Sequence, residues 1–271
     1  MNFKALDASK NIRERILRMS FESNHTSHLG GSLSLVEILS VLFFGNLKLD
    51  KKSMSEENRD RFVLSKGHGA LALFATLIEA GYMEESMENR YMQNGSDLIA
   101  HPIKNGSIGI ESSNGSLGQG LSFAVGLAIA NRIRHRNGYI FCVLGDGECG
   151  EGSIWEAAMS AVDLNLTNLI VIVDCNGFQS DGQIRPSLTS EKLQAKWLSF
   201  EWNAKLLDGH NIDEISKAII DKVPEKPLAL ICKTIKGKGV PFMEGNNTWH
   251  HNRLTAELYK DSLISVKAKT Q

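Results

Sequence analysis

The sequence predicts a doubly wound α/β fold, in which a mostly parallel sheet is sandwiched between two layers of helices. From residue 61 onward, short runs rich in β-branched residues alternate with helical stretches, as in a series of β-α-β units. Two of these runs, at residues 139–144 and 168–173, are almost entirely apolar and lack polar alternation. Such runs are typical of strands covered on both faces, as parallel strands are.

The individual elements follow from these patterns. Strands are expected at residues 61–65, 139–144, 168–174, 204–207 and 227–235. Helices are expected at residues 7–21, 33–45, 117–136 and 154–164, and at the helically spaced Ile212, Ile215, Ile219 and Val223. Ser153 and Glu156 have the spacing of a capping box at the start of the helix 154–164. Since no segment resembles an interdomain linker, residues 1–271 are expected to form one domain.

Composition limits the possible functions. The chain has 30 basic and 31 acidic residues, a formal charge of −1 and no long run of either sign, so binding to nucleic acid or to an anionic membrane is not expected. The charged amino-terminal segment does not read as a secretory signal, and no apolar stretch approaches the roughly 18 residues of a membrane span. We therefore expect a soluble, cytoplasmic protein whose four scattered cysteines are small core residues.

The most informative segment is GDGECGEG, residues 145–152, which directly follows the strand 139–144. Asn176 follows the next strand in the same way. Because the carboxyl ends of parallel strands share one edge of the sheet, Asp146 and Asn176 are expected to converge there. A carboxylate and an amide oxygen suit Mg²⁺ or Ca²⁺, and Gly145 and Gly147 allow phosphates to approach the backbone closely. Read singly, each loop is also a common turn signal.

The two loops together resemble the metal-binding signature of thiamine diphosphate enzymes. This resemblance implies that Asp146, Asn176 and the backbone carbonyl of Phe178 bind a divalent metal, Mg²⁺ or a substitute such as Ca²⁺, and that the metal holds the diphosphate of the cofactor. The signature usually ends in two asparagines, whereas Cys175 precedes Asn176 here.

Four further segments resemble the amino-terminal, diphosphate-binding half of transketolases. They are SHLGGSLS (27–34), RDRFVLSKGHGALAL (59–73), GSLGQGLSFAVGLA (115–128) and KTIKGKGVPFME (233–244) with the later TWHH (248–251). The resemblance implies that His28 and His68 line the cofactor and that His101 contacts the donor ketose. It also places His250 at the cofactor, with His251 as the alternative register. Histidines suit such positions because imidazole donates hydrogen bonds and moves protons near neutral pH.

Gly115, Leu117 and Glu151 are further candidates, each with a competing structural explanation. Leu117 lies at the start of a buried helix, just after Gly115, where free N–H groups can meet the cofactor, but close packing of the nearby glycines explains the same residues equally well. The resemblance places Glu151 at a subunit contact, whereas its position in a first helical turn also suits the helix dipole. Family members usually have glycine before the first histidine, so Ser27 is expected to shift the loop or narrow the donor pocket.

The resemblance also implies an incomplete active site. In transketolases, the carboxylate that activates the cofactor and most sugar-phosphate contacts belong to a following, pyrimidine-binding domain. We therefore expect the partner to be a carboxy-terminal transketolase subunit, in an α₂β₂ assembly that transfers a ketol unit between sugar phosphates. Two alternatives remain: half of a deoxyxylulose-phosphate synthase or 2-oxo acid dehydrogenase, and a non-catalytic chain that has kept the fold.

Overall fold

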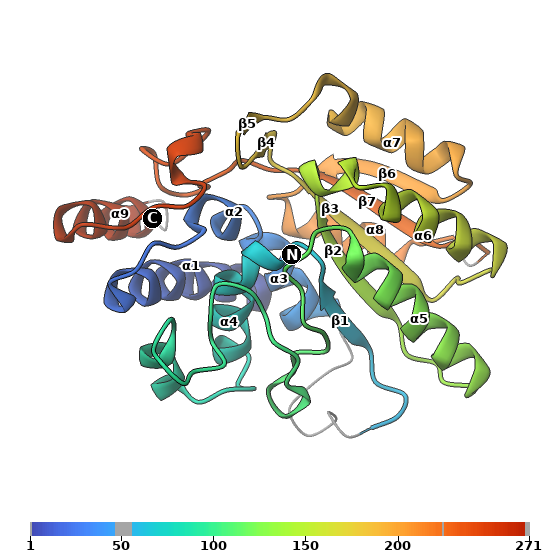
Figure 1. Ribbon diagram of the computed structural model, residues 1–271, viewed down its shortest axis with the longest axis horizontal. Helices are drawn as coiled ribbons and strands as arrows, with labels where there is room; N and C mark the ends of the chain where they lie inside the picture. Colours follow the sequence, from blue (N-terminus) through green and yellow to red (C-terminus); the bar gives the residue numbers. More distant parts are fainter. Residues whose placement is uncertain (1, 47–55, 224, 269–271) are drawn as a thin grey trace.

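The computed structural model describes residues 2–46, 56–223 and 225–268, and its centre is a five-stranded parallel sheet (Figure 1). In spatial order the strands are β1 (Arg61–Leu64), β2 (Ile140–Gly145), β3 (Leu169–Cys175), β7 (Leu228–Lys233) and β6 (Asn203–Asp208). Every neighbouring pair is parallel. The predicted α/β fold class is confirmed, and each predicted strand is present with its ends shifted by no more than two residues.

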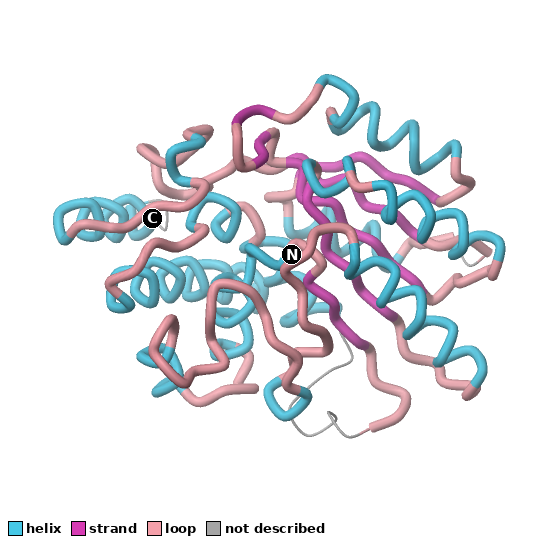
Figure 2. The backbone as a smooth tube through the Cα atoms, viewed as in Figure 1, coloured by secondary structure: helices cyan, strands magenta, loops and turns pink. Residues whose placement is uncertain are grey.

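Helices cover both faces of this sheet (Figures 1 and 2). One face carries α1 (Phe3–Ser23), α3 (Val36–Val41), α4 (Ala70–Glu79) and α8 (Ile212–Ile220), with α9 (Ala256–Ala268) packed on α1. The other face carries α5 (Gln119–Ile133), α6 (Gly152–Asp163) and α7 (Ser190–Ser199). Helix α2 (Leu29–Leu33) is a single short turn before α3, and β3 is followed by a small hairpin of β4 (Phe178–Gln179) and β5 (Gly182–Gln183).

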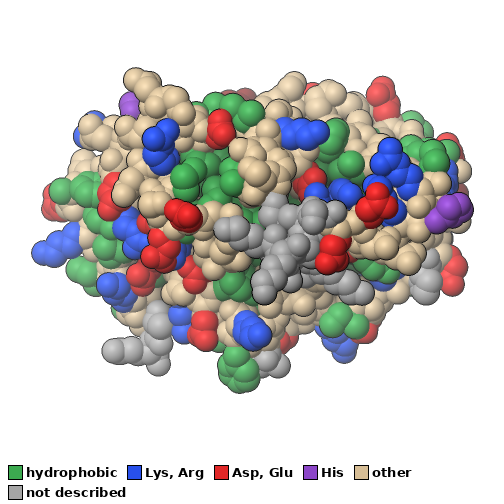
Figure 3. Space-filling model, turned by 90° about the horizontal axis from the view of Figure 1, so that it is seen from below, with side chains coloured by type: hydrophobic (Ala, Val, Ile, Leu, Met, Phe, Trp, Pro, Cys, Tyr) green, Lys and Arg blue, Asp and Glu red, His purple; other side chains and the backbone are tan. Residues whose placement is uncertain are grey.

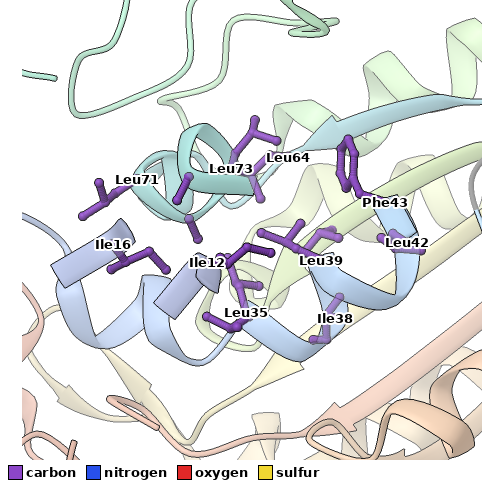
Figure 4. Close-up of a cluster of buried hydrophobic side chains, with 14 of the residues drawn as sticks. Ile12, Ile16, Leu35, Ile38, Leu39, Leu42, Phe43, Leu64, Leu71 and Leu73 are labelled. Carbon is purple, nitrogen blue, oxygen red and sulfur yellow. The ribbon is translucent and has the colours of Figure 1, made fainter. Parts of the chain in front are cut away.

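The strands divide the core into two apolar clusters. Alternate residues of β2 point to opposite faces, so Phe141 and Val143 join the cluster on the α1 side while Cys142 and Leu144 join the cluster on the α5 side. Figure 4 shows part of the first cluster, where leucine and isoleucine side chains of α1, α3 and α4 meet. Burial on both faces explains why β2, and β3 as far as Val173, are apolar.

Some helical boundaries differ from the prediction. The expected helix 33–45 is shorter in the structure: Leu33 ends α2, and the rest forms α3 and a following π turn (Leu42–Asn46). Between α2 and α3, the Ser34 hydroxyl donates to Asp174 at 2.6 Å. The predicted capping box at Ser153 is wrong: α6 begins at Gly152, and the Ser153 hydroxyl donates instead to the Gly118 carbonyl at 3.2 Å. Val223 lies beyond the end of α8. Helices α4, α7 and α9 are not among the helices predicted from the sequence.

The distribution of charge on the surface agrees with the nearly equal numbers of basic and acidic residues. On the face seen in Figure 3, basic and acidic side chains are interspersed over the described surface. Within residues 2–46, 56–223 and 225–268, none of the helices combines the length and the apolar character needed to cross a bilayer. The cytoplasmic location stays a prediction. All four cysteines lie in the described part of the chain as buried free thiols, which agrees with their expected place in the core.

A buried ionic network joins the helices on the α1 side to the loop after β7. Glu37 accepts hydrogen bonds from Arg13 at 2.6 Å and from His210 at 2.8 Å. The backbone N–H of Ile235 donates to the other ring nitrogen of His210 at 2.9 Å, and Arg13 also donates to the Lys238 carbonyl at 3.0 Å. Burial alone would raise the pKa of Glu37, but Arg13 and then His210 lower it to about 2. The network therefore fixes the backbone of residues 235–238.

We expect Glu37→Gln to lower the free energy of unfolding by about 3–5 kcal/mol near neutral pH, because it leaves the buried Arg13 without its counter-charge. The pKa of Glu37 falls from 4.5 to about 2 on folding, so its contribution is present above pH 4.5 and disappears as the pH falls toward 2. Chemical denaturation at several pH values measures both effects. Glu57→Gln, which removes an exposed partner of Arg136, is the control. Equal losses for the two variants would contradict the assigned role.

Candidate active site at the carboxyl edge of the sheet

The loops after β2 and β3 meet at the carboxyl edge of the sheet. Gly145, the last residue of β2, pairs with Asp174 in β3, so Asp146 and Asn176 leave the sheet from adjacent positions. One carboxylate oxygen of Asp146 accepts from the Gly147 N–H at 2.8 Å, and the other accepts from the Gly177 N–H at 2.7 Å. The second bond crosses between the loops and holds Asp146 beside the residues that follow β3.

Asp174 connects the segments at this edge of the sheet through buried contacts. Its carboxylate pairs with the ammonium of Lys66 and accepts hydrogen bonds from the hydroxyls of Ser34 and Thr234. Lys66 also donates to the Gly31 carbonyl at 2.9 Å, and the Asn176 amide donates to Asp174 at 3.3 Å. Asp174, Lys66 and Ser34 are at most 1% exposed. This ion pair was not identified from the sequence, although Lys66 lies within the SKGHG segment.

Glu148 connects the loop before α5, at Gly118, with the end of β2, at Gly145. Its carboxylate accepts from the N–H groups of Gly118 at 2.9 Å and Gly145 at 3.0 Å, and from the Ser65 hydroxyl. Burial raises the pKa of Glu148, while these hydrogen bonds act in the opposite direction. Gly118 has a φ of +88°, and an added Cβ would lie 2.5 Å from the Ser153 hydroxyl, so only glycine fits this close approach of α5 to α6. Like the ion pair, this role of Glu148 was not identified from the sequence.

A cavity of about 580 Å³ opens above these loops. Its walls include these residues that the sequence singled out for catalysis, cofactor or metal binding: His28, His68, His101, Gly115, Leu117, Gly145, Asp146, Gly147, Glu151, Asn176, Phe178 and His250. His251, the alternative to His250, does not line it. Lys66 and Glu148 also line it, as do Gln179 and Arg185 from the segment after β3. Segments that are distant in the sequence therefore share one polar cavity.

Histidine side chains form one part of the wall of this cavity. The ring of His28 lies 5.6 Å from that of His68, 5.7 Å from that of His101 and 5.4 Å from that of His250, measured between ring centroids. Burial is the main cause that lowers the pKa of His28 to about 3 and of His250 to about 4, and it also lowers those of His68 and His101. These imidazoles are therefore neutral near pH 7, and each can both donate and accept a hydrogen bond.

A second lysine lies close to this wall. The Lys236 ammonium is 3.0 Å from Nδ1 of His250 and 5.3 Å from the centre of the Phe178 ring. Burial, followed by the charge of Lys66, lowers the pKa of Lys236 to about 8, so it still carries a proton at neutral pH. Lys66 and Lys236 give this end of the cavity a positive character that suits a phosphate-bearing ligand.

The oxygen atoms around Asp146 suit a hard divalent cation. Burial, followed by the nearby Asp174, raises the pKa of Asp146 to about 7, although backbone hydrogen bonds and the charge of Lys66 act in the opposite direction. A divalent cation bound beside it would favour its ionised form. In the described part of the chain, His, Cys, Asp and Glu side chains do not form a metal-binding group of three or more. A metal beside Asp146 would therefore use amide and carbonyl oxygens as well. Asn176 Oδ1, which accepts from the Phe178 N–H at 3.1 Å, lies in the loop that offers both.

Fold and site together define an α/β protein that binds an anionic cofactor at the carboxyl edge of its sheet. Residues 9–267 match the family model described as the thiamine diphosphate-binding domain of transketolase. The chain is 40% identical over 242 residues to the 6-deoxy-6-sulfo-D-fructose transketolase subunit SqwG of Clostridium sp. (strain MSTE9), covering 89% of this chain and 88% of that protein. It is 36% identical to an apulose-4-phosphate transketolase subunit of Phocaeicola vulgatus, covering 98% of this chain and 94% of that protein.

A solved transketolase structure shows that the similarity extends to the fold. The transketolase of Campylobacter jejuni superposes with a TM-score of 0.88 at 30% identity, over 98% of this chain. The match spans 43% of that longer chain. This chain belongs to the transketolase family and contains its thiamine diphosphate-binding domain. The predicted family, the thiamine diphosphate cofactor and the class of enzyme, a transferase, are thus confirmed, whereas the divalent metal stays a prediction.

We expect Asp174→Asn to destabilise the chain by about 3–5 kcal/mol, because it leaves the ammonium of Lys66 buried without a counter-charge. Denaturant unfolding followed by circular dichroism measures the loss. Glu191→Gln is the matched control, since it removes a carboxylate from the exposed ion pair with Lys233 and should leave the unfolding midpoint nearly unchanged. An Asp174→Asn variant as stable as this control would show that the buried pair does not support the site.

Proposed function

We propose that this chain is the diphosphate- and metal-binding subunit of a two-chain transketolase. Together with its partner it transfers a two-carbon ketol unit from a ketose phosphate to an aldose phosphate. The observation that carries the proposal is the shared cavity, in which Asp146 and Asn176 lie beside two buried lysines and a wall of neutral histidines. A hard-cation site next to positive charge suits a metal-bound diphosphate, and neutral imidazoles suit proton transfer beside it.

Several residues would hold the cofactor. Asp146, Asn176 and the Phe178 carbonyl would bind Mg²⁺, for which Ca²⁺ can substitute. The diphosphate would meet His68, Lys236 and His250, and the backbone at Gly115, Leu117, Gly145 and Gly147. When bound, thiamine diphosphate supplies an electron sink for the cleavage and formation of the carbon–carbon bond. The chain contributes orientation, charge balance and the exclusion of water from the floor of the cavity.

The histidines would act on the sugar. His28 and His101 line the cavity and are neutral at pH 7, so each can donate a hydrogen bond to a sugar hydroxyl or take its proton. His250 has Lys236 as a neighbour, which disfavours protonation of its ring. A neutral His250 can accept a proton near the reacting carbon without first losing one.

A partner chain would cover the α5–α6 face of the subunit. Three large apolar side chains are exposed there: Phe123 at 39%, Ile133 at 70% and Met159 at 47%. Helix α5 is apolar almost all round, which is typical of a helix that is buried on every side. Glu151, exposed at the start of α6, lines the cavity and adjoins this face. We infer that a pyrimidine-binding subunit, which brings the activating carboxylate, docks here in an α₂β₂ assembly.

We expect Asp146→Asn to weaken metal-dependent binding of thiamine diphosphate by about 100-fold or more in the reconstituted pair, since loss of groups that merely support a metal ligand costs 10–100-fold. Isothermal titration calorimetry with and without Mg²⁺ measures the change. Asp163→Asn, an exposed aspartate at the end of α6, is the control. An unchanged affinity for Asp146→Asn would contradict the metal assignment.

We expect Ile133→Asp to weaken association with the partner chain at least about tenfold, because it would bury a charge in an apolar interface. Ile220→Asp is the matched control, because Ile220 on α8 is 71% exposed and lies on the opposite side of the sheet. Analytical ultracentrifugation measures association, and ketol transfer from a ketose phosphate is assayed in parallel. Transfer by the isolated chain, or decarboxylation of pyruvate as the main activity of the pair, would overturn the proposed function.

A further inference from the structure

A short backbone ladder places two histidines opposite each other at the mouth of the cavity. The Ser27 N–H donates to the Asn252 carbonyl at 2.9 Å, and the Asn252 N–H donates back to the Ser27 carbonyl at 3.1 Å. This bridge is antiparallel, so the next residue of one segment faces the preceding residue of the other. His28 and His251 are therefore cross-strand neighbours, and their ring centroids lie 4.6 Å apart.

His250 and His251 occupy different surroundings despite being adjacent in sequence. His250 lines the cavity and contacts Lys236. His251 is exposed and does not line the deep cavity, but it packs against the ring of His28. After burial, His251 is the next largest cause of the lowered pKa values of both His28 and His101, so it lies close to both. His251 thus stands at the outer rim of the histidine wall.

Ser27 does not narrow the donor pocket in the way the sequence suggested. Its side chain is 1% exposed, does not line the cavity and lies next to the buried Tyr91. Instead, the Ser27 backbone fixes the register of the bridge to Asn252. This register brings His251 against His28. The side chain that reduces the space beside His28 therefore comes from position 251.

We propose that His251 is a specificity-determining residue that contacts the ketose substrate and not the cofactor. The inference rests on the proposed function. A ketose carries hydroxyl groups on successive carbons, so one hydroxyl can bond to His28 while the next reaches the neighbouring imidazole. Asp146 and Asn176, the groups proposed to bind the metal, are buried and line the cavity, whereas His251 is exposed and does not line it. The second ring also limits the width available to a branched carbon chain.

The test uses the reconstituted two-chain enzyme with a set of ketose phosphates, linear and branched. We expect His251→Ala to raise KM for linear ketoses about tenfold, the effect of one lost hydrogen bond, with kcat changed less than about twofold. The preference for linear over branched ketoses should fall, and the affinity for thiamine diphosphate with Mg²⁺ should stay unchanged. His251→Gln keeps a donor and should recover part of the lost KM. His25→Ala, an exposed histidine near the same loop, is the control.

Two results would overturn the inference while the proposed function stands. One is an affinity for thiamine diphosphate that falls as much as KM rises, which would assign His251 to the cofactor. The other is an unchanged KM and an unchanged preference among ketoses in a wild-type pair that turns them over. If the wild-type pair transfers no ketol unit from any ketose, the proposed function fails and the inference falls with it.

Discussion

The ion pair between Asp174 and Lys66 is the constraint on which the site depends. Asp174 is the point where β3 reaches the carboxyl edge, and its partners come from the ends of β1 and β7 and from the turn between α2 and α3. An unpaired buried carboxylate at this place would cost several kcal/mol, so the surrounding segments are held in one arrangement. Asn176 then leaves the sheet in a fixed direction, with its amide bonded to the same carboxylate.

The same ion pair shapes the electrostatics of the cavity. The negative charge of Asp174 helps to raise the pKa of Asp146 to about 7, and the positive charge of Lys66 helps to keep His28, His68 and His250 neutral. Burial is the larger cause in each case. A divalent cation would favour the ionised form of this buried carboxylate, and neutral imidazoles suit proton transfer to and from sugar hydroxyls. In the proposed function, cofactor binding and substrate contacts thus both depend on one buried pair.

The sequence predicted those features that follow from position along a strand. Apolar runs located the strands, and the order of the parallel sheet placed Asp146 and Asn176 at one edge. What it could not predict depends on pairs distant in the chain. Lys66 and Asp174 meet across 108 positions, and Glu148 meets the Gly118 N–H across 30. Ser153 has the correct spacing for a cap, yet its hydroxyl bonds to Gly118 because α5 packs closely there. The pairing of His28 with His251 likewise appears only with the bridge between Ser27 and Asn252.

The central claim is that the loops after β2 and β3 bind a metal-bound diphosphate. The most direct measurement is the anomalous scattering of Mn²⁺, used in place of Mg²⁺, in crystals of the two-chain complex grown with thiamine diphosphate. We expect one strong peak in each copy of this chain, with oxygen ligands from Asp146, Asn176 and the Phe178 carbonyl at the short distances typical of small divalent cations. A peak bound by other residues, or thiamine diphosphate bound in this cavity without a metal, would contradict it.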